Sequence, residues 1–208
     1  MVLPDNRNAP PNPNRARISE SEFRLRNLLK HAPQDLWLDT IRRTRGDAHN
    51  GLIYWMLSQP QCDFAVAAHA FYRSNPAHHV DNPHPLPARP GPDNMFAVVL
   101  FNWDTGSYRS HRLKVEAQDA HPRMIARLNQ KLLVHAGGKA LPFRIPPEFQ
   151  RPEGGQPAQI PSHMSPDDNP QIWSLYADLG LHVPDSPPGL KRKLTAAKEL
   201  LRKFRLAR

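Results

Sequence analysis

The sequence lacks several features that usually reveal a protein's compartment. It has a single cysteine, Cys62, among 208 residues, so no disulfide can form within the chain. No stretch reaches the ~18 consecutive apolar residues of a membrane-spanning helix. The N-terminal stretch MVLPDNRN is polar and has no apolar signal core. These absences exclude a disulfide-stabilised fold, predict a cytoplasmic location and argue against a membrane partner.

Signatures of cofactor binding are also missing. The stretch HAGGK at 135–139 contains glycines and a lysine, but it follows a predicted helix instead of opening one. A phosphate-binding loop needs a strand before the glycines and a helix after them. The stretch is therefore interpreted as a helix end, and we expect no cofactor.

Proline, in contrast, is abundant, with 24 residues, more than twice its average usage of about 5%. Most of the clustered prolines fall in two segments, and such runs cannot enter helix interiors or central strands. We therefore predict Pro-rich connectors at 77–94 and 141–166. Together with a polar leader expected to be disordered, they divide the chain into the segments 1–17, 18–76, 77–94, 95–140, 141–166 and 167–208.

Residues 18–76 carry the signals of a helical unit. Ser19 is a good N-cap, and Glu22 follows three residues later, as in a capping box. Further helices are expected at about 35–44, from Asp47 or Asn50, and after Pro60, where apolar residues recur at helical spacing. We therefore predict an all-helical N-terminal unit.

The pattern changes after the first connector. MFAVVLFNW at 95–103 is short, β-branched and aromatic, which favours a buried strand. WDTGS then supplies turn residues, and YRSHRLKV continues as a more polar strand, so a β-hairpin is predicted. A helix at about 122–136 follows. The predicted fold class is α+β and mostly α-helical, with helices again at the C-terminus.

Cys62 lies beside Asp63 and seven residues before His69, which raises the question of a catalytic thiol. Two helical turns separate Cys62 from His69, about 10 Å along the axis, so the pair cannot form a dyad by itself. We therefore predict that Cys62 is a buried packing residue and that Asp63 is favoured by the helix dipole.

A family resemblance covers residues 46–76. The order GDAHNG, YW, PQCDFAVAAHAFY and NP resembles the domain-of-unknown-function 4274 family, a bacterial group. The resemblance implies a small helical unit. It implies no chemistry and no site residues.

The stretch HHVDNPH groups side chains that can bind zinc or nickel. Its spacing matches no rigid metal motif, and its Pro-rich surroundings favour a solvated loop. The candidate ligands are therefore weak: His78, His79, Asp81 and His84.

Residues 190–208 combine an apolar seam with strong positive charge. Apolar side chains recur at spacings of 4, 3, 4 and 3, and eight Lys or Arg stand against Glu199 alone. The segment thus carries a net charge of +7 out of the +9 of the chain. We predict a basic amphipathic helix. It could dock on the protein's own core or a partner protein, on the phosphates of nucleic acid or, as the least favoured of the three, on an anionic membrane. Its candidate partner-binding residues are Leu190, Leu194, Leu201, Phe204, Lys191, Arg192, Lys193 and Arg202.

Three functions remain open from the sequence. The first prediction is a non-enzymatic cytoplasmic interaction protein, immunity- or adaptor-like, which binds a protein partner through the C-terminal seam. The alternative is a nucleic-acid-binding accessory protein that uses the same basic segment. The third is a Cys- or metal-dependent enzyme.

Overall fold

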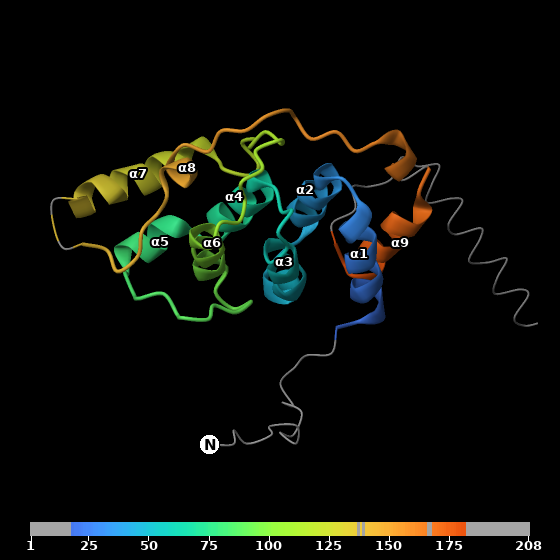
Figure 1. The fold of residues 1–208 in the computed structure, drawn as a ribbon, viewed down its shortest axis with the longest axis horizontal. Helices are drawn as coiled ribbons and strands as arrows, with labels where there is room; N and C mark the ends of the chain where they lie inside the picture. The colour runs from blue at the N-terminus through green and yellow to red at the C-terminus, as the bar shows by residue number, and fades with distance from the viewer. Residues whose placement is uncertain (1–17, 137, 139, 166–167, 182–208) are drawn as a thin grey trace, which may run out of the picture.

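The computed structural model describes residues 18–136, 138, 140–165 and 168–181. This part of the chain is mostly α-helical (Figure 1). Its helices are α1 (Glu20–His31), α2 (Gln34–Arg43), α3 (Asn50–Leu57), α4 (Phe64–Arg73), α5 (Pro76–Asp81), α6 (Met95–Asp104), α7 (Pro122–Ala136), α8 (Pro147–Gln150) and α9 (Pro170–Asp178), with short 3-10 turns η1 (Asp47–His49) and η2 (Ser162–Met164).

The helices of the N-terminal unit begin at residues whose side chains cap them. Ser19 Oγ accepts a hydrogen bond from the backbone N–H of Glu22 at 3.1 Å, as the capping signal predicts. Asp63 caps α4 in the same way, because its Oδ1 accepts from Ala65 N–H at 3.0 Å. The helix after Pro60 therefore begins four residues later than that proline suggests.

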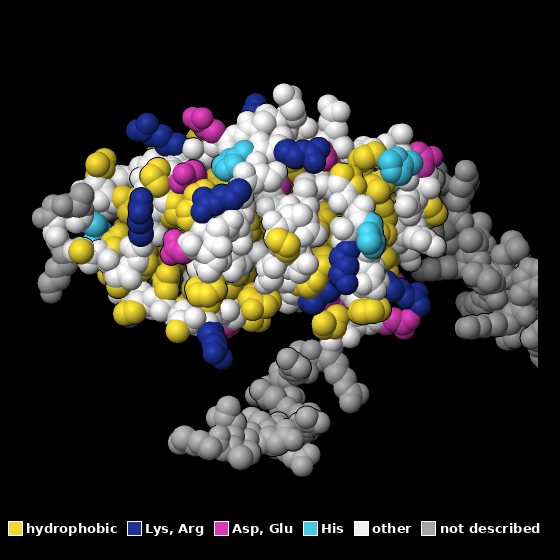
Figure 2. Space-filling view, viewed as in Figure 1, with side chains coloured by type: hydrophobic (Ala, Val, Ile, Leu, Met, Phe, Trp, Pro, Cys, Tyr) yellow, Lys and Arg dark blue, Asp and Glu magenta, His cyan; other side chains and the backbone are white. Residues whose placement is uncertain are grey.

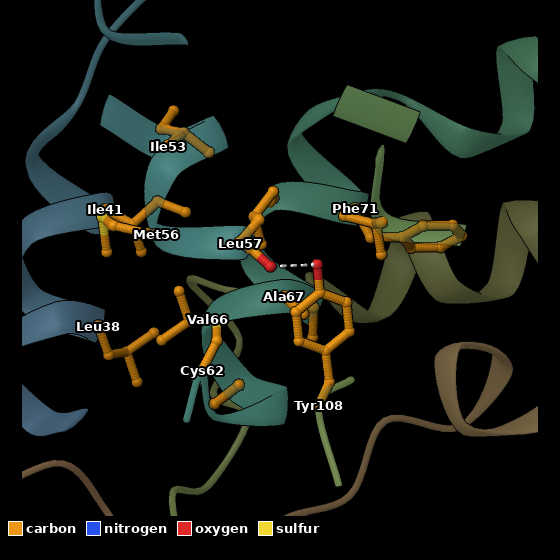
Figure 3. Close-up of a cluster of buried hydrophobic side chains, with 14 of the residues drawn as sticks. Leu38, Ile41, Ile53, Met56, Leu57, Cys62, Val66, Ala67, Phe71 and Tyr108 are labelled. Atoms are coloured by element: carbon orange, nitrogen blue, oxygen red, sulfur yellow. Dashed lines mark hydrogen bonds between the residues drawn. The ribbon is translucent and has the colours of Figure 1, made fainter. Parts of the chain in front are cut away.

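Helix α4 lies at the centre of the fold, with α2 on one side and α6 on the other (Figure 1). Four of its ten residues are alanines, and small side chains allow neighbouring helices to approach closely. Figure 3 shows Val66, Ala67 and Phe71 of α4 within a cluster of apolar side chains. In the same cluster, the hydroxyl of Tyr108 donates to the carbonyl of Leu57 at 3.0 Å.

The prediction of a β-hairpin is wrong. Residues 95–104 form α6, capped by Asn94, whose side chain accepts from Ala97 N–H at 3.0 Å. Helix α6 packs against both α3 and α4, so it is apolar on nearly every face and its sequence shows no helical period. No hairpin is present in the described residues, where the single β-bridge joins Leu113 to Gln156 in parallel.

The two Pro-rich segments are partly helical, because α5 begins at Pro76 and continues into the first, and α8 lies within the second. The second segment runs along the body from α8 towards α9 (Figure 1). It is held by backbone hydrogen bonds from Gln156 N–H to Arg112 O at 2.8 Å and from Lys114 N–H to Gln156 O at 2.7 Å. A Cβ at Gly155 would lie 2.3 Å from Arg112 O, so this close approach requires glycine there.

Helices α5 and α7 pack together at one end of the body, and α1 and α9 pack together at the other (Figure 1). None of the helices in the described ranges is long and apolar enough to cross a membrane.

Candidate functional site

The residues that the sequence most clearly predicts to bind a partner lie outside the described part of the structure. All eight predicted partner-binding residues, from Leu190 to Phe204, lie in 182–208, outside the described residues. The predicted leader at 1–17 also lies outside them. The amphipathic C-terminal helix therefore stays a prediction.

The histidine-rich stretch forms α5 and the residues after it, and its side chains go to different partners. Asp81 Oδ1 pairs with Lys131 Nζ of α7 at 2.8 Å. The ring of His79 stacks on Phe96 with centroids 4.1 Å apart. Burial, together with the neighbouring His78 and His84, lowers the pKa of His79. Within the described residues, no three His, Cys, Asp or Glu side chains gather where they could hold a metal ion.

Cys62 is 1% exposed and lies in the apolar cluster beside Val66 (Figure 3). Burial, followed by the negative charge of Asp63, raises the pKa of the thiol well above its ordinary value. The nucleophilic form of cysteine is the thiolate, which this environment disfavours. The structure thus buries Cys62 as predicted, and His69 bonds to Asp119 instead.

Asp63 does more than the sequence interpretation assigned to it. Its side chain is buried and caps α4 through Oδ1, while Oδ2 accepts from Ser110 Oγ at 2.8 Å and from Arg112 N–H at 3.0 Å. The carboxylate therefore fastens an irregular segment, nearly fifty residues later in the chain, to the start of α4. No local sequence signal indicates those two distant donors.

A second buried carboxylate, Asp119, is the centre of a charged cluster that the sequence analysis missed. Arg42 of α2 donates to it twice, from Nε to Oδ1 at 2.8 Å and from Nη2 to Oδ2 at 2.6 Å. His69 of α4 donates from Nδ1 to Oδ1 at 3.1 Å, and the backbone N–H of Glu116 donates to Oδ2 at 3.0 Å. Glu116 also accepts from Arg42, at 2.8 Å. We call these four residues the Asp119 cluster.

Asp119 is ionised in this environment. Burial acts to raise its pKa, but the hydrogen bonds from Arg42 and His69 outweigh that effect and hold the pKa below its ordinary value. An ionised carboxylate can only accept, so the proton of a neutral His69 ring is on Nδ1 and its Nε2 is an acceptor. The cluster thereby fixes the tautomer of His69.

His69 lines a cavity of about 220 Å³ together with Tyr72, Arg73, Gln118, Asp119, His121 and Met124. An imidazole oriented by a carboxylate is a component of general-base sites. However, none of these lining residues is Ser, Thr or Cys, and Tyr72 donates its hydroxyl to the carbonyl of Phe149. The arrangement supplies an oriented base without a nucleophile, and its evident effect is to bind α2 and α4 to the segment 116–119.

A larger cavity, of about 360 Å³, lies where α3, α4 and α6 meet and includes Asp47, Asn50, Arg73, His79 and Asp93 in its lining. The guanidinium of Arg73 is already bound to backbone: it donates to the carbonyl of Thr44 at 2.9 Å and to that of Gly46. Arg73 therefore holds the turn before α3 in place.

Helix α7 presents a surface that the fold does not cover. Leu133 and Val134 are 76% and 71% exposed, and Arg123 and Arg127 are exposed on the turns before them. We call these four residues the α7 outer face. In Figure 2, basic and apolar side chains both reach the surface at the end of the molecule that holds α7. Such a mixture can contact another macromolecule.

The fold and these sites define the class only as a mostly α-helical protein with a buried ionic cluster. No protein-family model, curated protein or solved structure matches the chain. The resemblance of residues 46–76 to the domain-of-unknown-function 4274 family therefore stays a prediction.

Proposed function

We propose that this chain is a non-enzymatic cytoplasmic interaction protein, immunity- or adaptor-like, that binds a protein partner. The observation that carries the proposal is an apolar seam with alternating spacings of four and three residues, formed by Leu190, Leu194, Ala197, Leu201 and Phe204. An isolated helix of that length is marginal in water, so the seam needs an apolar surface on which to dock.

The ionic groups of the described body support this proposal, because the most buried of them serve the fold. The Asp119 cluster joins two helices and a loop, Arg73 holds a turn, and the pair of Arg43 with Asp39 is internal to α2. The net charge of +7 in 191–208 is thus the main unbalanced charge of the chain. A partner with an acidic rim around an apolar groove would complement it.

The test compares two variants of the full chain. Leu194→Asp with Leu201→Asp removes the seam, whereas Lys191→Gln, Arg192→Gln and Lys193→Gln remove charge and keep the seam. Affinity purification from the native cell at low and high salt supplies the partner, and calorimetry then measures its binding. We expect the Asp variant to lose binding and the Gln variant to weaken it only slightly. Normal binding by the Asp variant would refute the proposal.

Binding of nucleic acid is the second candidate, and the basic tail is the observation that favours it. Here the Gln variant should lose binding to random duplex DNA, and the slope of log K against log salt should fall by roughly three. The Asp variant should still bind DNA. The same two variants therefore separate the candidates.

A further inference from the structure

We propose that the α7 outer face is a contact surface for an acidic protein partner with an apolar pocket. This inference rests on the proposed function, since it assumes that the chain binds a protein. It goes further by assigning a surface within the described residues and by stating the chemistry of the partner.

Leu133 and Val134 lie outside the buried stripe of α7. The inner face of α7 is already occupied, because Leu128 is fully buried and Ile125 and Leu132 pack against the core. Leu133 and Val134 follow directly in the sequence, and successive helical residues differ by about 100°, so they lie beyond the edge of that inner stripe. Single exposed apolar residues are normal, but here two neighbouring residues of one helix are both more than 70% exposed.

The charged residues of α7 are all basic. The α7 sequence PRMIARLNQKLLVHA contains three basic residues and no acidic one. Lys131 is paired with Asp81 of α5, but neither Arg123 nor Arg127 forms a side-chain ion pair with a described residue. The two arginines are four residues apart, so they lie one turn from each other on the same side of the helix. Arg127 does act on the charge of Asp81, whose pKa Lys131 and Arg127 lower, but one carboxylate against three basic residues leaves α7 with a net positive charge.

The small apolar area on α7 favours a protein partner over a membrane. A helix that lies on an anionic membrane inserts a whole apolar face into the lipid. The apolar face of α7 is instead buried against the body, which leaves Leu133 and Val134 as its large exposed apolar side chains among the described ones. Two anchoring side chains next to arginines suit a protein pocket with an acidic rim. Another copy of this chain would bring arginines against arginines on this face.

The experiment places a photo-crosslinking amino acid at Val134 of the full chain in the native cell. The control position is Gln171, an exposed residue of α9 at the opposite end of the body. We expect Val134, but not Gln171, to give a heteromeric adduct whose crosslinked peptide is rich in Asp and Glu. Arg123→Glu with Arg127→Glu should remove most of that adduct. Arg45→Glu with Arg89→Glu changes the net charge equally at exposed positions outside α7 and α8 and should preserve it.

The crosslinked protein is then purified and titrated with the chain. Leu133→Ser with Val134→Ser should weaken binding by about tenfold or more. Lys substitutions at the crosslinked acidic residues should restore binding of the Arg123→Glu, Arg127→Glu variant, which a nonspecific contact would not do.

Several results would overturn the inference: no adduct at Val134, an adduct of two copies of this chain, a crosslinked surface without acidic residues, or unchanged binding by the Ser variant. Sedimentation with vesicles of anionic phospholipid that depends on Leu133 and Val134 would assign the face to a membrane instead. If the tail variants abolish partner binding while all α7 variants bind normally, this inference fails and the proposed function stands. If the chain binds no protein at all, both fail.

Discussion

Helices α4 and α7 differ in how completely their apolar residues are buried. Helix α4 is buried on most sides, and its alanines let α2 and α6 approach it. Helix α7 buries one stripe against α5 and α8 and leaves Leu133 and Val134 in solvent. Side chains of α4 therefore contribute to the stability of the fold, whereas the exposed pair of α7 is available for contact with other molecules.

The comparison predicts that truncating a buried side chain of α4 lowers the free energy of unfolding far more than truncating an exposed side chain of α7. Phe71→Ala in α4 removes a fully buried ring and should lower the free energy of unfolding by about 3–5 kcal/mol. Leu133→Ala in α7 removes a side chain that is already mostly in water and should change it by less than about 0.5 kcal/mol. Urea denaturation of both variants measures the difference. Equal losses would mean that the α7 pair belongs to the core.

The link between α4 and its surroundings through Asp119 should also be costly to break. Asp119→Asn leaves Arg42 with Glu116 as its remaining acidic partner and should cost about 2–4 kcal/mol at pH 7. Asp178→Asn is the control, because Asp178 is exposed and, among the described residues, accepts one long side-chain hydrogen bond, from Ser21 at 3.4 Å. Thermal unfolding at a series of pH values measures the stability of both variants.

The direction of the pH effect follows from the lowered pKa of Asp119. Burial opposes ionisation, but Arg42 and His69 keep the folded-state pKa below the unfolded value of about 3.9. The stabilisation is therefore complete above that unfolded value and is lost as the pH falls through the lower folded one. The difference between the wild type and Asp119→Asn should shrink below about pH 4. A difference that stays constant from pH 7 to pH 2 would contradict this account.

The sequence predicts a helix correctly where the capping residue and the apolar spacing of that helix lie within the helix or next to it. The capping residue Ser19 and the spacing in α1, α2 and α7 give the helices nearly as the structure has them. The run at 95–103 misleads, because a helix buried on nearly every side has no polar face to reveal its period. The choice between strand and helix there depends on packing against α3 and α4, which a single sequence does not display.

The candidate sites show the same limit. The Asp119 cluster joins residues 42, 69, 116 and 119, and no spacing within a short stretch indicates that they meet. The histidine stretch is a local pattern, yet Asp81 pairs with Lys131 and His79 stacks on Phe96, so its side chains do not converge on one point. Burial of Cys62 was predictable because its reason is local: it directly precedes an Ala-rich helix that must pack closely.

Truncation of Cys62 should cost less stability than the changes at Phe71 and Asp119, and it tests how tightly the start of α4 is packed. Cys62→Ala removes one buried sulfur and should cost about 1 kcal/mol, because the cavity left behind is small. The thiol should also react slowly with iodoacetamide at neutral pH, since burial and Asp63 raise its pKa and little thiolate is present. The rate should rise to that of a free thiol in urea. Fast labelling of the native protein at pH 6 would mean that Cys62 is an accessible thiolate, and the packing at the start of α4 would then be open to solvent.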